Sequence, residues 1–244
     1  MRVVACVDGY VGGKLTEWLC QNHPNAVALY VTTTKNAIFD YCVSENLPVI
    51  SADGKDIASV IPQPFDVGLL LWWPAIISAN AIAMASVGYV NTHPSLLPLH
   101  RGKNPNFWAL TAGEPFGVSL HFIGSGIDDG DLIAQTPVPY DWTDNGGSIY
   151  ARGLDAMIDL FKATFPQILD GTYERQPIDV ATGSLHFGRQ LEPASRINLD
   201  DTFTARDLLN LLRARTFSTH PSCTFEEKGV RYEVRVAITR QDPT

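Results

Sequence analysis

The first half of the chain alternates short apolar runs with segments whose apolar residues recur at helical spacing. Most of the runs are almost continuously apolar, which is typical of parallel strands covered on both faces. They predict strands at residues 2–8, 26–32, 66–73 and 88–93. The segments between them predict helices at residues 12–22, 36–46 and 78–87. This alternation favours an α/β fold with a mostly parallel, doubly wound sheet and helices on both faces.

The hydrophobic pattern changes in the second half of the chain. The later elements that it predicts are a strand at 117–124, a long helix at about 147–169, a helix at 204–216 and a hairpin within 221–238. Residues 177–201 are polar and irregular, and they mark a change in composition near residue 175. We therefore expect a main catalytic domain at residues 1–180 and a small α+β C-terminal subdomain at 181–244, made of a helix and a hairpin.

Length and hydropathy are those of an ordinary globular protein. The chain has 244 residues, of which 45% are hydrophobic, enough for one sizeable core or a main domain with a small appendage. The longest apolar stretch, residues 65–85, is interrupted by Pro74 and Asn80, so no run reaches the roughly 18 apolar residues of a membrane span. The N-terminal residues read as a buried strand rather than a secretory signal, which predicts a cytoplasmic protein without membrane association.

The net charge of the chain narrows the classes of molecule that it can bind. The formal net charge is −8, and a negative surface repels nucleic acid at long range, although a local basic pocket for a small anion remains compatible with it.

The four cysteines (Cys6, Cys20, Cys42 and Cys223) form no CxxC pair, and three of them lie in apolar stretches. Buried reduced thiols are therefore favoured over disulfides or metal ligands.

Glycines at the first predicted junction between strand and helix offer two interpretations. In dinucleotide-binding folds, this junction binds a pyrophosphate. The segment DGYVGGK at residues 8–14 does not match the GxGxxG spacing, and no acidic residue clearly ends the second strand. A tight turn that requires the backbone freedom of glycine is the favoured interpretation.

Asn91 and His93 lie at the carboxyl end of a predicted strand, where open α/β sheets bind ligands. Their spacing of two places both side chains on one face, so that an amide donor lies beside a base. Such a pair suits a reaction in which an oxyanion develops while a proton moves. For the pair alone, hydrogen bonds to the loop backbone are the simpler interpretation. A carboxylate at Asp128 or Asp129, on a second loop, would orient His93 and stabilise its protonated form.

The loop that follows His93 is unusually rich in prolines, histidines and cationic residues. Residues 91–110 read NTHPSLLPLHRGKNPNFWAL, with prolines, histidines, an arginine and a lysine close together. Connecting loops are usually about 4–6 residues long, and longer ones more often carry function. This segment is therefore a candidate part of a functional site.

Two segments, NTHPSLLPLHRG and GVSLHFIGSGIDDGDLIAQ, resemble the formyltransferases that use 10-formyltetrahydrofolate. That family shares the signature Asn-x-His-Pro-Ser-Leu-Leu-Pro, followed further along the chain by Asp-x-Gly. The likeness covers residues 65–136 and, more loosely, the flanking Rossmann-like elements. The residues that it assigns to catalysis are Asn91, His93 and Asp128. Asp128 is chosen over Asp129 because it stands two residues before Gly130.

The resemblance implies a role for each of the three residues. A neutral amine attacks the formyl carbon, and the Asn91 amide donates a hydrogen bond to the resulting oxyanion. His93, supported by Asp128, stabilises the tetrahedral intermediate and handles the amine proton. A proton must also reach the folate nitrogen before tetrahydrofolate can leave.

The resemblance also implies a folate pocket built largely from main-chain groups of two loops. The residues that it assigns to folate binding are Pro74, Ala75, Ile76, Ile77, Ile123 and Gly124. A helix entrance with buried Ile76 and Ile77 is the alternative interpretation of the first loop. Trp72 and Trp73, just before it, either form a stacking wall or pack in the core. The resemblance implies no metal.

The segment RGKNPNFW is similar to one in sugar N-formyltransferases, where His usually stands at the position of Asn104. The implied acceptor is the amine of an amino sugar linked to a nucleoside diphosphate, a precursor of cell-surface polysaccharides such as lipopolysaccharide O-antigen. The implied substrate-binding residues are Arg101, Lys103 and Asn106. Arg101 and Lys103 would offset diphosphate charge. Ordinary solvation of the loop is the alternative.

Three alternatives remain open at this point. Glycinamide ribonucleotide formyltransferases usually lack the RGKNPNFW segment, and methionyl-tRNA formyltransferases usually add a basic C-terminal domain that binds nucleic acid. A non-catalytic module that binds folate or a sugar nucleotide would need no catalytic trio. Sugar formyltransferases of this type are commonly dimers, so the resemblance also implies a homodimer. The nucleotide, the sugar and the position of its amine are not specified by any motif that we recognise.

Overall fold

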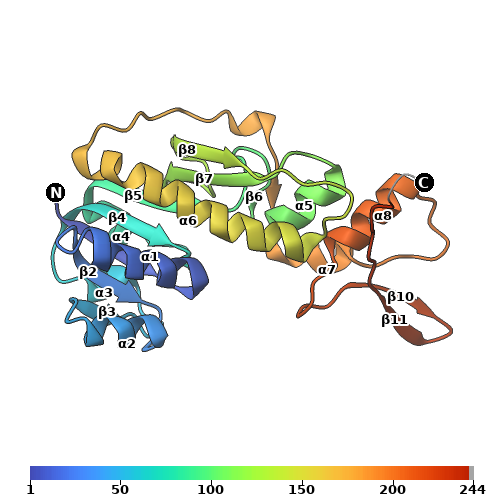
Figure 1. Ribbon diagram of the computed structural model, residues 1–244, viewed down its shortest axis with the longest axis horizontal. Coiled ribbons are helices and arrows are strands. Elements are labelled where there is room, and N and C mark those ends of the chain that lie inside the picture. Colours follow the sequence, from blue (N-terminus) through green and yellow to red (C-terminus); the bar gives the residue numbers. More distant parts are fainter. Residues whose placement is uncertain (242–244) are drawn as a thin grey trace. The chain divides into compact units, whose positions relative to one another are not determined.

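The protein is represented by a computed structural model that describes residues 1–241 (Figure 1). The described residues form two compact units, and neither is a continuous stretch of chain. Unit 1 comprises Met1–His93, Ser119–Ala134 and Met157–Pro177, and unit 2 comprises Pro94–Val118, Gln135–Ala156 and the chain from Ile178 onward. The domain division expected at residue 180 stays a prediction. Residues 242–244 of the expected subdomain lie outside the described residues.

A seven-stranded sheet is the main structural element, with the order β3-β2-β1-β4-β5-β7-β8. Its strands are β1 (Val3–Val7), β2 (Val27–Thr32), β3 (Val49–Ser51), β4 (Phe65–Leu71), β5 (Ala85–His93), β7 (Gly117–Phe122) and β8 (Leu132–Pro137). The neighbouring strands from β3 to β5 pair in parallel, whereas β7 pairs antiparallel with β5. The predicted α/β fold with a mostly parallel sheet is confirmed.

The core of unit 1 follows from the continuous apolar runs. All five residues of β1 are fully buried, so both faces of the sheet are covered at this strand. Full burial of an aliphatic side chain contributes about 1.5–3 kcal/mol, which makes such a strand a strong determinant of the fold. Tyr89 of β5 packs where Gly68 of β4 leaves room, because a Cβ on Gly68 would lie 2.1 Å from the tyrosine ring.

The helices of unit 1 connect the parallel strands. They are α1 (Gly9–Asn22), α2 (Ala37–Ser44), α3 (Ile57–Val60) and α4 (Ala79–Ala83), and α6 (Gly146–Asp170) contributes residues to both units. The predicted helix at 78–87 is wrong in its second half, since α4 ends at Ala83 and β5 begins at Ala85. Pairing decides this boundary, because Ala85 lies opposite Phe65 of β4 in the parallel ladder.

The first junction between strand and helix requires glycine for two reasons. Gly9 has φ of +57°, and a Cβ on it would lie 2.7 Å from the Trp72 ring. A Cβ on Gly12 would lie 2.9 Å from the carbonyl oxygen of Leu71, so this glycine permits close packing of the helix on the sheet. The geometry therefore supports the tight-turn interpretation of this segment.

Unit 2 is built mainly from short elements. These are β6 (Arg101–Gly102), α5 (Pro105–Ala112), η1 (Val180–Thr182), β9 (Leu185–His186), η2 (Gly188–Gln190), α7 (Leu191–Ala194), α8 (Ala205–Ala214), β10 (Cys223–Glu227) and β11 (Val230–Val234). The predicted C-terminal helix and hairpin are present as α8 and as the antiparallel pair β10 and β11. Leu211 and Leu212 of α8 pack with Phe107 of α5 in a shared core.

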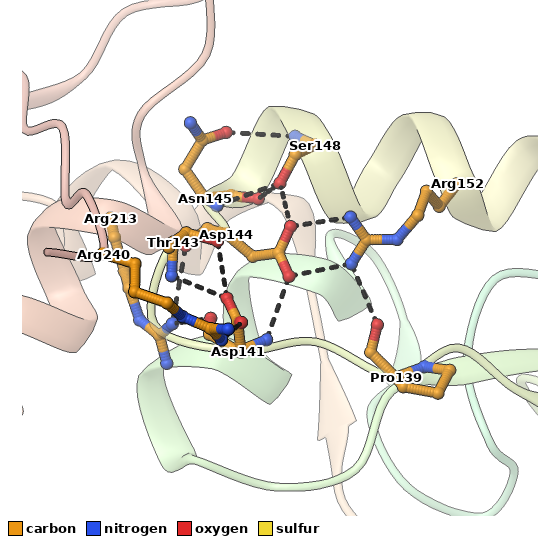
Figure 2. A network of polar contacts seen from close by, with 9 residues as sticks. All are labelled: Pro139, Asp141, Thr143, Asp144, Asn145, Ser148, Arg152, Arg213 and Arg240. Carbon is orange, nitrogen blue, oxygen red and sulfur yellow. Dashed lines mark hydrogen bonds and ion pairs between the residues drawn. The ribbon is translucent and has the colours of Figure 1, made fainter. Parts of the chain in front are cut away.

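The start of α6 is held by a network of polar contacts around Asp144, shown in Figure 2. The Asp144 carboxylate accepts hydrogen bonds from Arg152 at 2.6 and 2.9 Å, from Ser148 Oγ at 2.8 Å and from the Asp141 backbone N–H at 2.9 Å. The hydrogen bonds from Arg152 are the largest influence that lowers the pKa of Asp144 to about 2. This carboxylate is thus a charged anchor for the helix start.

The sequence predicted that the chain has no membrane span and that its cysteines are reduced thiols. Among residues 1–241, no helix is long and apolar enough to cross a bilayer. All four cysteines are free thiols, and Cys6, Cys42 and Cys223 are buried. Burial raises the pKa of the Cys6 thiol to about 12 and that of Cys42 to about 11, which keeps both thiols protonated near neutral pH.

Candidate active site

Strand β5 positions two of the predicted catalytic residues. Asn91 lies opposite Leu70 of β4 on one side and opposite His121 of β7 on the other. His93, two residues further, lies opposite Ser119 of β7 and is only 5% exposed. Because side chains alternate along a strand, Asn91 and His93 share one face of the sheet with His121.

The loop after β7 brings Asp128 to this face. Asp128 has φ of +48°, in the left-handed region that aspartate tolerates better than most residues. Its Oδ2 lies 3.5 Å from His93 Nδ1, and its Oδ1 lies 3.7 Å from His121 Nε2. The side chain is 14% exposed. One carboxylate therefore faces two buried imidazoles, and the three residues predicted from the motif lie together.

The neighbouring Asp129 has a different position. Its Oδ2 accepts a hydrogen bond from the Gly126 backbone N–H at 2.8 Å, within the same loop. A Cβ on Gly124 would lie 2.3 Å from the Asp129 carboxylate, so glycine allows this close approach. Asp129 thus shapes the loop that presents Asp128.

His121 of β7 contacts the amide of Asn91 and lies close to the Asp128 carboxylate. It is fully buried, its Nδ1 lies 2.8 Å from the Phe122 carbonyl oxygen, and its Nε2 lies 3.1 Å from Asn91 Nδ2. Burial, with a smaller contribution from His93, lowers the pKa of His121 to about 4. The antiparallel register that places His121 opposite Asn91 is the signal that would have found this contact.

The two loops predicted to bind folate both belong to unit 1. Pro74, Ala75 and Ile76 are exposed, with Ile76 at 92%, whereas Ile77 is 8% exposed and packs in the core. Burial of Ile77 agrees with the helix-entrance interpretation, and exposure of Ile76 contradicts it for that residue. In the second loop, Ile123 and Gly124 are half-buried.

The two tryptophans before the first loop have packing roles. The Trp72 ring contacts Gly9, and its backbone N–H donates to Thr92 Oγ1 at 3.1 Å. Trp73 packs on the hydrophobic core of unit 1. Both contacts favour core packing over a free stacking wall.

The predicted substrate residues belong to unit 2. Arg101 is half-buried in β6, which pairs in parallel with β9, and Lys103 is exposed. Asn106 is 6% exposed and donates from Nδ2 to the Gly146 carbonyl oxygen at 3.2 Å, so its amide joins α5 to the start of α6. Asn104 precedes α5 with φ of +60°, a conformation in which Asn is among the preferred residues.

The segment around β6 and β9 is held by aromatic and imidazole groups. Trp108 stacks on His186 with ring centroids 4.1 Å apart and donates from Nε1 to the Lys103 carbonyl oxygen. His100 Nδ1 lies 3.2 Å from Ser184 Oγ, and its Nε2 lies 2.9 Å from the Glu114 carboxylate. His100 is buried, and this burial lowers its pKa. These contacts fix the backbone that carries Arg101 and Lys103.

The side chains of the site are of the kinds used in acid–base chemistry. Within residues 1–241, no group of three or more His, Cys, Asp or Glu side chains is arranged to hold a metal ion. Asn91, His93, His121 and Asp128 instead combine an amide donor, two imidazoles and one carboxylate on a single face.

This fold and site define the chain as a member of the formyl transferase family. Residues 21–164 match the family model described as "Formyl transferase". Residues 190–240 match a second model, the N-formyltransferase dimerization C-terminal domain, which supports the predicted homodimer. The resemblance inferred from the sequence motifs is thereby confirmed.

Several relatives and solved structures are similar to this chain. A dTDP-4-amino-4,6-dideoxyglucose formyltransferase from Mycobacterium tuberculosis is 31% identical over 164 residues, which cover 67% of this chain and 70% of the relative. A sugar N-formyltransferase from Shewanella has the same fold, with a TM-score of 0.81, 20% identity and 99% of each chain covered. An N-formyltransferase from Helicobacter canadensis, solved with folinic acid and dTDP-3-aminofucose, has a TM-score of 0.69 and 20% identity, with 87% of this chain and 79% of that chain covered.

Proposed function

We propose that this protein transfers the formyl group of 10-formyltetrahydrofolate to the amine of an amino sugar linked to a nucleoside diphosphate. The observation that carries the proposal is the grouping of Asn91, His93 and Asp128 on one face of unit 1, in a chain of the formyl transferase family. The 31% identical relative acts on a dTDP-linked amino sugar, which supports this class of acceptor.

In the proposed reaction, the neutral amine attacks the formyl carbon and forms a carbon–nitrogen bond. The carbonyl π electrons move to oxygen, and the Asn91 amide donates a hydrogen bond to the oxyanion. Collapse of the tetrahedral intermediate breaks the bond between the formyl carbon and the folate nitrogen N10. The amine loses one proton and N10 gains one, so the products are an N-formyl sugar and tetrahydrofolate.

His93 is the proposed carrier of this proton. Asp128, 3.5 Å from His93 Nδ1, supports the imidazolium that forms when His93 accepts the proton from the amine. Deep burial of His93 strengthens this electrostatic support, since few water molecules screen it. General acid–base catalysis of this kind typically contributes about 10²–10⁴-fold to the rate.

The folate ring is proposed to bind along the loops at 74–77 and 123–128. Exposed apolar side chains of Ile76 and Ile127 support this placement, because a pterin has flat apolar faces as well as polar edges. Main-chain groups of the two loops, including those of Ile123 and Gly124, would bind these polar edges.

The diphosphate of the acceptor is proposed to bind Arg101 and Lys103. Both are cationic, and the backbone of Lys103 is held by bonds to His186 and Trp108. A guanidinium can contact two phosphate oxygens at once, whereas an ammonium offers a compact charge. Asn106 is proposed to support the segment through its bond to Gly146 rather than to contact the acceptor.

Related formyltransferases with other acceptors are the alternatives. A methionyl-tRNA formyltransferase from Clostridium thermocellum and a glycinamide ribonucleotide transformylase from Symbiobacterium toebii share the fold, with TM-scores of 0.65 and 0.59. The negative net charge of −8 disfavours a tRNA acceptor, because association with nucleic acid is driven largely by cationic contacts to phosphate.

The proposal extends to assembly, location and pathway. A homodimer formed through residues 190–240 is expected, in keeping with the matched dimerization domain. A cytoplasmic location is proposed because four free cysteines suit a reducing compartment. The product is proposed to supply precursors of cell-surface polysaccharide such as lipopolysaccharide O-antigen.

A panel of acceptors tests the proposal. The purified protein is incubated with 10-formyltetrahydrofolate and, separately, dTDP- and UDP-linked amino sugars, glycinamide ribonucleotide and methionyl-tRNA. Formation of tetrahydrofolate and of an N-formyl sugar, detected by mass spectrometry, is the expected result. Formylation of glycinamide ribonucleotide or methionyl-tRNA, with every amino sugar inert, would overturn it.

A further inference from the structure

His121 contacts the proposed catalytic residues from a neighbouring strand. Its Nε2 lies 3.1 Å from Asn91 Nδ2 and 3.7 Å from Asp128 Oδ1, and its ring is perpendicular to that of His93 at a centroid distance of 6.1 Å. The side chain is fully buried. The expected reaction chemistry leaves this histidine without a role, although it touches the amide that would bind the oxyanion.

The backbone determines which nitrogen of His121 carries a proton. Nδ1 lies 2.8 Å from the Phe122 carbonyl oxygen, which only accepts hydrogen bonds, so Nδ1 must be the donor. Complete burial disfavours the doubly protonated, cationic ring. His121 is therefore neutral, and its Nε2 is a bare acceptor that faces Asn91.

The bare Nε2 in turn determines the orientation of the Asn91 amide. An amide can present either its oxygen or its NH₂ group to a neighbour, and the network of hydrogen bonds decides between them. An oxygen placed 3.1 Å from an unprotonated Nε2 would bring two lone pairs together, whereas an N–H satisfies the acceptor. One Nδ2–H of Asn91 therefore bonds to His121, and the second Nδ2–H remains to bind another acceptor.

We propose that His121 is a positioning residue that orients the Asn91 amide so that its second Nδ2–H binds the formyl oxygen in the transition state. The proposal rests on the proposed formyl transfer. In this chain of hydrogen bonds, Asn91 donates to His121 Nε2, and His121 Nδ1–H donates to the Phe122 carbonyl oxygen. This chain links the backbone of β7 to the oxyanion site. Without it, the amide can rotate and present its oxygen, which repels the oxyanion.

Replacement of the ring tests this role through turnover. His121→Phe keeps a planar ring of similar size but removes the acceptor, and kcat is expected to fall by about 10–100-fold, as for a misplaced catalytic group. KM for both substrates is expected to change by less than about threefold, since His121 is not proposed to contact either of them. His121→Gln, whose amide oxygen can accept from Asn91, is expected to recover part of the lost kcat.

A double-mutant cycle separates positioning from a general structural effect. In an Asn91→Ala background the amide is absent, so His121→Phe is expected to lower kcat by less than about threefold. His23→Phe is the matched control, because it makes the same replacement at a histidine packed between Trp18 and Phe165. Its turnover is expected to be unchanged. Multiplicative losses in the cycle would overturn the proposal.

The ring nitrogens provide a test that needs no formyl acceptor. Long-range ¹H–¹⁵N NMR spectra of the wild-type protein, assigned by loss of the signals in His121→Phe, are expected to show a protonated Nδ1 and a bare Nε2 at pH values near neutrality. A protonated Nε2 would overturn the proposal whatever the substrate. If no acceptor is formylated but the tautomer is as expected, the proposed function has failed while the orientation of Asn91 is retained.

Discussion

Two carboxylates of this protein are almost equally shielded from solvent but have different partners. The side chain of Asp128 is 14% exposed and that of Asp144 is 13% exposed. Asp144 bonds to the permanent cation of Arg152 at 2.6 Å, whereas Asp128 lies 3.5 and 3.7 Å from two imidazoles. Burial therefore does not distinguish these two carboxylates, whereas their partners do.

The difference lies in how the partner carries its charge. A guanidinium stays protonated at all accessible pH values, so Arg152 holds Asp144 as a fixed anion that stabilises the start of α6. An imidazole gains and loses a proton near neutral pH, so a carboxylate beside it favours one state of a proton-transfer group. We infer that Asp144 contributes to stability and Asp128 to chemistry.

The largest expected effect is that of His93→Asn. Removal of the proposed proton carrier is expected to lower turnover by roughly 10²-fold or more, because general acid–base catalysis is lost. The melting temperature is expected to remain close to that of the wild type. Turnover at saturating concentrations of both substrates, with a thermal melt as the control for folding, measures this. Near-normal turnover would show that the mechanism is wrong even in a formyltransferase.

A double variant that combines His93→Asn with Asp128→Asn tests whether the two residues act as a unit. Groups that act together give non-additive losses, so Asp128→Asn in a His93→Asn background is expected to change turnover by less than about threefold. Single-turnover rates of the two single variants and the double variant measure the coupling. Independent, multiplicative losses would assign Asp128 a role that does not pass through His93.

Asp144→Asn is expected to lower stability instead of turnover. Hydrogen bonds to charged groups contribute about 1.5–3 kcal/mol, and partial retention by the amide reduces the loss to about 1–2 kcal/mol. Urea unfolding measures the change in the free energy of unfolding. Thr143→Ala is a neighbouring control that keeps the bonds between Asp144 and Arg152. An unchanged free energy in Asp144→Asn would refute the structural role.

The smallest expected effect is a pH dependence of this stability difference. The folded-state pKa of Asp144 is lowered to about 2, below the ordinary value for aspartate, mainly by hydrogen bonds from Arg152. Its contribution is therefore fully present above about pH 5 and decreases as the pH falls below the unfolded-state pKa of about 3.9. The difference in unfolding free energy between wild type and Asp144→Asn should shrink from about pH 6 to about pH 3. A constant difference would contradict this origin of the stability.

Continuous apolar runs predicted the parallel strands of the fold well, because strands covered on both faces need apolar residues at almost every position. The end of α4 was misplaced because the Ala-rich run 79–85 contains no residue that ends a helix, whereas Ala85 already pairs with Phe65 of β4. Helix α5 was missed because Asn104 and Pro105, which begin it, are typical of loops. Short elements such as β3 lack a periodic signal of sufficient length.

The candidate site was predicted from a motif rather than from periodicity. Asn91 and His93 were assigned from the Asn-x-His motif, whereas the approach of Asp128 depends on a loop with a residue at positive φ. The contact between His121 and Asn91 was not predicted, because it depends on the antiparallel register of β5 and β7. Register arises from pairing across the sheet, which the spacing of residues along one strand does not specify.

The matched pair Asp128→Asn and Asp144→Asn provides the most direct test, with formyl transfer to a dTDP-linked amino sugar and urea unfolding measured on the same preparations. Asp128→Asn is expected to lower kcat by roughly 10²-fold while the free energy of unfolding changes little. Asp144→Asn is expected to lower the free energy of unfolding by about 1–2 kcal/mol while kcat stays within about twofold of wild type. Equal kcat values for Asp128→Asn and wild type would contradict the proposed active site.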